Sequence, residues 1–237
     1  MRFLFLLITI LFTGCVTMLP QVKDEFLAGK TKEQEEVLFK LEDQIVEINK
    51  QKAGIEKKIN ISKQLKKVNE SEYPYQKNKL NYYTENQELY ILTGNAAKMA
   101  QTGNDLKKIE LDIKLNLLMN EYVSYLKSYH QSSLDLNYAE LSAKIAELSY
   151  EKSKIAAAYI DLKTAQPDPA AEKDPKKQKA ENKNPIVVAD YLKQFEERKK
   201  SLADKKTINE NYLIELNKAE KKIKDEGFTI NPEFIVK

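Results

Sequence analysis

Few side chains in this sequence have the chemistry of a catalytic or metal-binding site. Cys15 and His130 are the only cysteine and the only histidine in 237 residues. One thiol and one imidazole cannot supply the ligands of a Cys/His zinc site. Any thiol–imidazole couple or Ser-His-Asp triad would need His130, and the sequence suggests no acidic or thiol partner near it. We therefore expect no metal, no cofactor and no enzymatic activity, and we expect His130 to be a packed or surface side chain.

The acidic side chains give no sign of a catalytic pair either. Neighbours such as Glu35 and Glu36, or Glu196 and Glu197, point about 100° apart on a helix and do not converge on one substrate. The sequence also lacks a Gly-rich phosphate loop and a calcium loop of EF-hand spacing. These carboxylates are typical of the solvated face of a coiled coil.

The chemistry open to Cys15 is lipidation. One basic residue precedes an uncharged apolar run at 3–12, which has the length of a signal-peptide core and not of a membrane span. The small residues Thr13 and Gly14 lead directly to Cys15. This segment resembles the lipobox of bacterial lipoproteins, in which a Leu-like residue and two small residues precede an acylated cysteine. Phe12 stands where the family usually has leucine, a departure that looser lipoboxes, such as those of spirochaetes, tolerate.

The resemblance implies a signal peptide over 1–14 and a mature chain that begins at acylated Cys15. Residues 15–30 are then expected to be a polar tether. Because no Asp follows Cys15, the sorting rule of enterobacterial lipoproteins implies the periplasmic face of the outer membrane, with exposure on the cell surface as an alternative. The other alternative is a short signal anchor that extends to Leu19, with Cys15 incidental.

Glycine and proline are scarce, which limits the number of turns. The chain has 6 Gly and 7 Pro, under half of what average usage of about 7% and 5% would give. A sheet-rich domain of this size needs many sharp turns, which draw on these residues. We therefore predict an all-α fold, an elongated antiparallel helical bundle or coiled coil with long helices.

The charge is nearly balanced, and this excludes a class of partner. Removal of 1–14 would remove Arg2 alone and leave 38 Lys and Arg against 36 Asp and Glu. A net charge of about +2 is too small for a nucleic-acid binder or for electrostatic binding to a membrane. The expected partners are the membrane, through Cys15, and other proteins, including copies of this chain.

A long helical hairpin or coiled-coil region is predicted over 31–166. Thr31 and Gln34 have capping-box spacing and start the first helix. Pro74 predicts its end, because proline lacks an amide donor and disfavours helical angles before it. A less regular helix follows over 76–101, and 102–105 predict a break or kink, with Asn104 or Asp105 as the next N-cap. The first helix carries a heptad seam, which Lys52 interrupts. The apolar residues of this seam are Leu38, Leu41, Ile45, Ile48, Ile55 and Ile59.

Residues 105–166 contain neither glycine nor proline, so a continuous helix over them would extend roughly 90 Å. Two apolar seams run along opposite faces of it. This helix is therefore predicted to be sandwiched between neighbours, either helices 31–70 and 186–226 of the same chain or other copies. The first seam contains Leu134, Tyr138, Leu141, Ile145, Leu148, Lys152, Ile155, Tyr159 and Leu162. The second contains Leu111, Leu115, Leu118, Tyr122, Tyr125, Tyr129, Ser132, Leu136, Ala139, Ala143, Ala146, Tyr150, Ser153, Ala157 and Ile160.

The C-terminal part divides at its prolines and at Gly227. Residues 167–185 are charged and contain four prolines, and we expect a disordered linker. Binding of its five lysines to anionic lipid or cell-wall polymer is the alternative. A helix is expected over 186–227, with Gly227 as a left-handed cap.

Two sets of side chains are candidates for binding a partner. Residues 228–237 are expected to be extended, and one face of this tail carries Phe228, Ile230, Phe234 and Val236. The tail either packs back on the bundle or docks to another protein by strand addition. The second set is a stripe at heptad spacing, Tyr122, Tyr125 and Tyr129, for which helix packing is the first interpretation and aromatic recognition the alternative.

These features favour a non-enzymatic structural or adaptor lipoprotein of an envelope assembly. Its long helices, with small residues on one face, are similar in pattern alone to the hairpins of periplasmic efflux tunnels and adaptors. The alternatives are a surface-exposed lipoprotein that binds a ligand, and a periplasmic helical chaperone that holds unfolded outer-membrane proteins.

Overall fold

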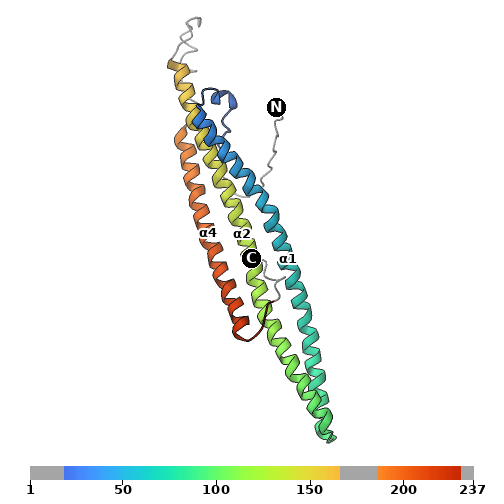
Figure 1. The fold of residues 1–237 in the computed structure, drawn as a ribbon. Coiled ribbons are helices and arrows are strands. Elements are labelled where there is room, and N and C mark those ends of the chain that lie inside the picture. The colour runs from blue at the N-terminus through green and yellow to red at the C-terminus, as the bar shows by residue number, and fades with distance from the viewer. Residues whose placement is uncertain (1–18, 166–185, 231–237) are drawn as a thin grey trace.

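The computed structural model describes residues 19–165 and 186–230, which fold as an elongated all-α bundle. A short 3-10 helix, η1 (Asp24–Leu27), precedes three long helices, α1 (Lys32–Leu92), α2 (Ala96–Ala165) and α4 (Val188–Asp225). Within the described ranges there is no strand. The helices lie along one narrow body, with α1 and α4 each antiparallel to α2 (Figure 1). The 70 residues of α2 extend roughly 105 Å.

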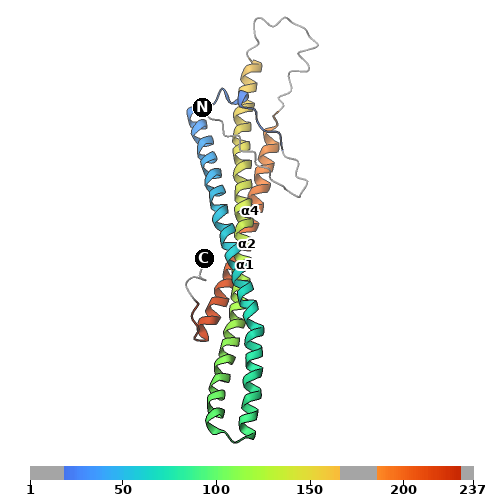
Figure 2. The ribbon, with the colours of Figure 1, turned by 90° about the vertical axis from the view of Figure 1, so that its right-hand side faces the viewer.

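The central helix is α2, and this confirms the prediction of a sandwiched helix. It packs against α1 on one side and α4 on the other. Its first seam faces α1, where Ile155 packs with Leu38, and its second seam faces α4, where the rings of Tyr150 and Phe195 stack with centroids 6.2 Å apart. In the side view α1 crosses from one side of α2 to the other along its length (Figure 2), as heptad seams require in a supercoil.

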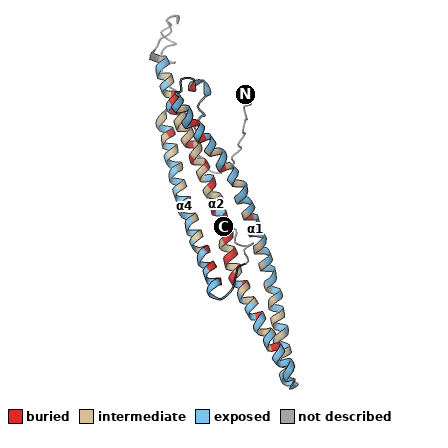
Figure 3. Cartoon of the chain, viewed as in Figure 1, coloured by how far each residue is buried: buried red, intermediate tan, exposed pale blue. Residues whose placement is uncertain are grey.

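The largest core lies between the second seam of α2 and the C-terminal half of α4. Tyr122, Leu126, Leu216 and Ile223 are fully buried there, and Ile230 joins them. Buried residues gather along α2, while the outer faces of α1 and α4 are exposed (Figure 3). Since full burial of one large apolar side chain contributes about 1.5–3 kcal/mol, this core fixes α4 on α2.

A second cluster closes the proximal end, the end at which the described chain begins. Leu27 of η1, Leu38 of α1 and Ile155 of α2 are buried together. The hydroxyl of Tyr191 in α4 donates a hydrogen bond of 2.7 Å to the carbonyl of Pro20. Much of the segment that the sequence predicts to be a tether is therefore packed on the bundle.

Hydrogen bonds confirm the predicted start of α1 at Thr31 and the predicted end of α4 at Gly227. Thr31 N–H donates to Gln34 Oε1 at 2.9 Å, and Gln34 N–H donates to Thr31 Oγ1 at 3.2 Å, which is the capping box. At the other end Gly227 has φ +80°. Gly227 N–H donates to Lys224 O, and Phe228 N–H donates to Ile223 O, the two bonds of a Schellman cap.

The predicted end of the first helix at Pro74 is wrong, because α1 continues through it to Leu92. An internal proline costs about 3 kcal/mol through its missing donor and its clash with the preceding turn. Here α1 is attached to α2 on both sides of the proline. Asn69 bonds Asn116 before it, and Gln87 lies against Gly103 after it. Tertiary packing therefore offsets the local preference to end the helix.

The predicted break at 102–105 is also wrong, because α2 starts at Ala96 and runs through these residues. The turn of the hairpin lies instead at 93–95, where Gly94 has φ +66°, a conformation that glycine adopts without a steric penalty. Thr93 is the C-cap of α1, and the side chain of Asn95 accepts a 3.2 Å hydrogen bond from Lys98 N–H. Gly94 therefore has the boundary role that the sequence assigned to 102–105.

The hairpin of α1 and α2 extends beyond the end of α4. Near the end of α4, the side chain of Lys114 in α2 forms an ion pair with that of Glu226, just after α4. The 18 residues of α2 before Lys114 cover roughly 27 Å, and among the described helices they have only α1 as a neighbour (Figure 1). We call residues 74–113 the distal arm, and residues 89–99 its tip.

Several predicted features lie outside the described residues. They are the signal peptide at 1–14, Cys15, the linker at 167–185, and the tail residues Phe234 and Val236. In the described part of the chain, no helix is long and apolar enough to cross a membrane.

Truncation of one core residue tests the role of the α2–α4 core. Leu126→Ala removes a side chain with no exposed surface and should lower the free energy of unfolding by about 2–5 kcal/mol. Leu117→Ala, on the same helix but about half exposed, should change it by no more than about 0.5 kcal/mol. Urea denaturation followed by circular dichroism measures both, and similar losses for the two variants would contradict the assigned core.

Candidate functional site

The tyrosine stripe lies inside the body. Tyr122 is fully buried between α2 and α4, and Tyr125 and Tyr129 are half-buried against the same core. Burial raises the pKa of Tyr122 to about 12, and the negative charge of Glu220 adds to the effect. The structure thus uses Tyr122 for helix packing, and only the outer parts of Tyr125 and Tyr129 face solvent.

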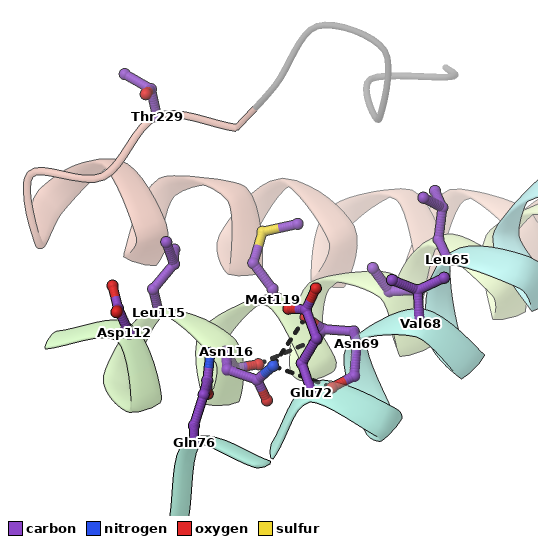
Figure 4. Close-up of a pocket in the computed structure, with 11 residues that line it drawn as sticks. Leu65, Val68, Asn69, Glu72, Gln76, Asp112, Leu115, Asn116, Met119 and Thr229 are labelled. Carbon is purple, nitrogen blue, oxygen red and sulfur yellow. Dashed lines mark hydrogen bonds between the residues drawn. The ribbon is translucent and has the colours of Figure 1, made fainter. Parts of the chain in front are cut away.

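The start of the predicted tail also packs on the body. Ile230 is buried in the α2–α4 core, and Phe228 is partly buried against it. Thr229 lies over the α1–α2 hairpin (Figure 4). Residues 228–230 therefore pack back on the bundle, which is one of the two alternatives that the sequence left open for the tail. Partner binding by Phe234 and Val236 stays a prediction.

His130 has a partner that the sequence did not reveal. Its Nδ1 lies 2.7 Å from the hydroxyl oxygen of Ser62 in α1, and both residues are almost fully buried. The Ser62 hydroxyl also lies 2.9 Å from the carbonyl of Lys58 in its own helix. A histidine that contacts a serine hydroxyl can activate it as a nucleophile. This pair, however, is buried between packed helices, and neither residue lines the groove described below. It joins α1 to α2. Its two residues are 68 positions apart in the sequence, so local sequence patterns do not reveal the contact.

Side-chain amides between the two helices, of which Asn116 and Asn137 are buried, fix the alignment of α1 with α2. Asn69 Nδ2 donates to the carbonyl of Asn116 at 3.1 Å, and Asn116 Nδ2 donates to the carbonyl of Asn69 at 3.0 Å. Further along, Asn137 Nδ2 donates to the carbonyl of Ile48 at 3.0 Å. Buried asparagines at core positions specify register, since a shifted pairing would leave them unsatisfied.

A groove of about 380 Å³ lies where the arm leaves the rest of the body. Its apolar wall is formed by both helices of the hairpin and includes Leu65, Leu115 and Met119, with Thr229 above it (Figure 4). The buried Oε1 atom of Gln76 accepts no hydrogen bond from the described part of the chain. The polar part of the lining includes the carboxylates of Glu72 and Asp112, and the described residues contain no cluster of three or more His, Cys, Asp and Glu that could hold a metal ion.

The distal half of α1 carries an apolar stripe that the sequence analysis missed. Val68, Tyr75, Tyr82 and Leu89 are spaced by seven residues, and each is more than half exposed. Seven-residue spacing keeps side chains on one face of a supercoiled helix. The stripe was detectable in the sequence, but the predicted helix end at Pro74 divided it.

At the tip, large apolar side chains are exposed on both helices. Leu92 is 85% exposed and Ile91 is 59% exposed, and Met99 on α2 is also exposed. The site that the structure presents is therefore a surface, formed by the stripe and the tip of the distal arm.

Comparison with protein-family models, with curated proteins and with solved structures finds no match to this chain.

The raised pKa of Tyr122 predicts a loss of stability at alkaline pH. An unfolded tyrosine ionises near pH 10, whereas folded Tyr122 holds its proton up to about pH 12. The stabilisation is complete below pH 10 and is lost as the pH rises towards 12, by an amount on the order of 2 kcal/mol. Tyr122→Phe should therefore show a shallower decline in unfolding free energy between pH 9.5 and 11.5.

Tyr75→Phe is the matched control, because Tyr75 is two-thirds exposed on the distal arm. Its urea denaturation curves should follow the pH dependence of the unmodified protein. Identical slopes for Tyr122→Phe and the unmodified protein would show that Tyr122 does not titrate as assigned.

Proposed function

We propose that this protein is a non-enzymatic, lipid-anchored helical spacer and adaptor on the periplasmic face of the outer membrane. Acylated Cys15 would hold the proximal end at the membrane. The described body would then project from that membrane and present its distal arm to partners. The observation that carries the proposal is the arm itself, which extends past α4 and bears the exposed residues Tyr75, Tyr82 and Leu89 of an apolar stripe that begins at Val68, just before the arm.

The arrangement of the two ends supports a spacer. Residues 19–31 pack at the proximal end, with Leu27 against Leu38 and Ile155, whereas the turn at Gly94 lies at the opposite end of the body (Figure 1). A chain attached to a membrane a few residues before Leu19 would place its tip roughly 100 Å from the attachment point. Polar contacts that fix helix alignment, such as Asn69 with Asn116, favour a rod of defined length.

The stripe favours helices as partners, with copies of this chain as the first candidate. Heptad spacing matches a second helix in a supercoil. Each aromatic side chain covers roughly 150–250 Å² when it is fully buried, so two paired stripes would cover on the order of 800 Å² in total. That area belongs to weak and reversible contacts, which suit an adaptor whose partners exchange.

Loss of the acylated residue tests the anchor. Cys15→Ser should abolish the added lipid mass and cleavage by the lipoprotein peptidase, so the chain should keep its apolar run at 3–12 and move from the outer-membrane fraction to the inner-membrane fraction. Mass spectrometry of the mature chain and fractionation of cells measure the two effects. An unmodified protein that starts at Met1 and carries no lipid would rule out this anchor.

Substitution within the stripe tests the adaptor surface. Tyr75→Lys with Tyr82→Lys should reduce the yield of cross-linked species of this chain in cells at least fivefold. Both side chains are exposed, so the free energy of unfolding should change little. Phe39→Lys is the matched control, because Phe39 is equally exposed on α1 but lies outside the arm. An unchanged cross-linking pattern in the double variant would remove the stripe as a partner site.

A ligand-binding lipoprotein on the cell surface is the second candidate, and the groove beside Met119 and Gln76 supports it. Protease treatment of intact cells separates the two. Digestion of the protein in intact cells would favour the surface-exposed alternative, and digestion only after permeabilisation would favour the periplasmic spacer.

A further inference from the structure

The tip of the distal arm, together with the residues that follow it up to Asn104, carries less charge than the chain as a whole. Of the 16 residues from Leu89 to Asn104, Lys98 is the only charged one, whereas 32% of the whole sequence is charged. At the average density this segment would carry about five charges. The helices of the arm thus end in a region that is poorly suited to a charged partner.

The exposed apolar side chains of the tip surround it and do not form one face. At 100° per residue, Leu89 and Leu92 lie 60° apart, and Ile91 lies roughly opposite Leu89. All three are at least half exposed. Met99 adds an exposed apolar side chain from α2, and Figure 3 shows most of the end of the hairpin as exposed.

We propose that this tip inserts into the surface of a lipid bilayer. A helix that is apolar around its circumference needs an apolar environment on every side. A pocket or a helix of another protein would cover one face of the tip and leave the opposite face in water. Hydrocarbon surrounds an inserted tip completely, so a bilayer is the partner that covers Leu89, Ile91 and Leu92 together.

The polar groups of the tip set the depth of insertion. Glu88 on α1 lies four residues before Leu92, which is roughly 6 Å along the helix. On α2, the amine of Lys98 lies 5.4 Å from the ring centroid of Tyr90, at about the same level. These charges would stay among the headgroups, with Tyr90 in the interface that tyrosine prefers. An insertion of about one helical turn agrees with the 5–10 Å of interfacial segments.

Insertion of one turn is also consistent with the absence of a membrane-spanning helix in the described part of the chain. Together with the proposed anchor at Cys15, it would make the protein a bridge between two membranes. This bridging role rests on the proposed function, whereas the binding of the tip to lipid does not.

The absence of tryptophan from the sequence gives a local test. Leu92→Trp places one fluorophore at the tip, and Ile214→Trp places one at an exposed apolar position in the middle of α4. Each substitution is made in the full chain with Cys15→Ser, and each variant is mixed with vesicles of phosphatidylcholine and phosphatidylglycerol. We expect the emission of the Leu92→Trp variant to shift to shorter wavelength and its quenching by iodide to fall at least threefold. The Ile214→Trp variant should show no change.

Two outcomes would overturn the proposal. In the first, the emission of the Leu92→Trp variant is the same with and without vesicles. In the second, its blue shift appears without vesicles and grows with protein concentration, which would assign the tip to a second copy of the chain. Since the emission reports the surroundings of position 92 alone, attachment of another part of the chain to the vesicles does not affect the reading.

Vesicle clustering by the lipidated protein separates the tip from the anchor. The unmodified protein should cluster vesicles, and Ile91→Asn with Leu92→Asn should abolish clustering while the chain stays attached to one vesicle. Removal of residues 1–15, which leaves neither the lipid nor the apolar run at 3–12, should also abolish clustering but keep the blue shift of the Leu92→Trp variant. A lipidated protein that clusters vesicles equally well with both Asn substitutions would contradict tip insertion and leave the anchor intact.

Discussion

The structure depends on one constraint, which is that α2 is apolar on two opposite sides along much of its length. A single partner helix would leave one seam in water, so α1 and α4 cover the two sides. The two interfaces differ in chemistry. The one with α4 is a continuous core around Leu126 and Ile223, whereas the one with α1 includes polar contacts such as Ser62 with His130. The body is long and narrow because three long helices pack side by side along their length.

The same constraint explains why the distal arm is exposed. Coverage of the second seam ends where α4 ends, at the contact of Lys114 with Glu226. Beyond that point, among the described elements, α2 has α1 alone as a neighbour, and no third element covers the outer faces of the pair. The stripe residues Tyr75, Tyr82 and Leu89 and the tip around Leu92 lie on this part of the hairpin. The surfaces proposed to bind partners and lipid therefore follow from the difference in length between α2 and α4.

Local rules succeeded where a few neighbouring residues determine the conformation. The capping box at Thr31 and the left-handed cap at Gly227 were predictable, because their hydrogen bonds join residues three to five positions apart. Pro74 and Gly94 show the limit. Each carries a local preference, but only the alignment of α1 with α2 decides that the helix continues through the proline and turns at the glycine. Asn69 and Asn116 fix that alignment, and they are 47 residues apart.

The sequence by itself determined the fold class, the two seams of α2 and the caps at Thr31 and Gly227, since periodicity and capping are properties of short segments. Tertiary structure decided which candidate surfaces are available. It buried Tyr122 and Ile230 in the core, although the sequence made both candidates for binding a partner. It left Tyr75 and Tyr82 exposed. The physical reason is that exposure depends on how far each helix reaches along its neighbour, and the position of the hairpin turn and the placement of α4 along α2 are set by contacts between distant residues.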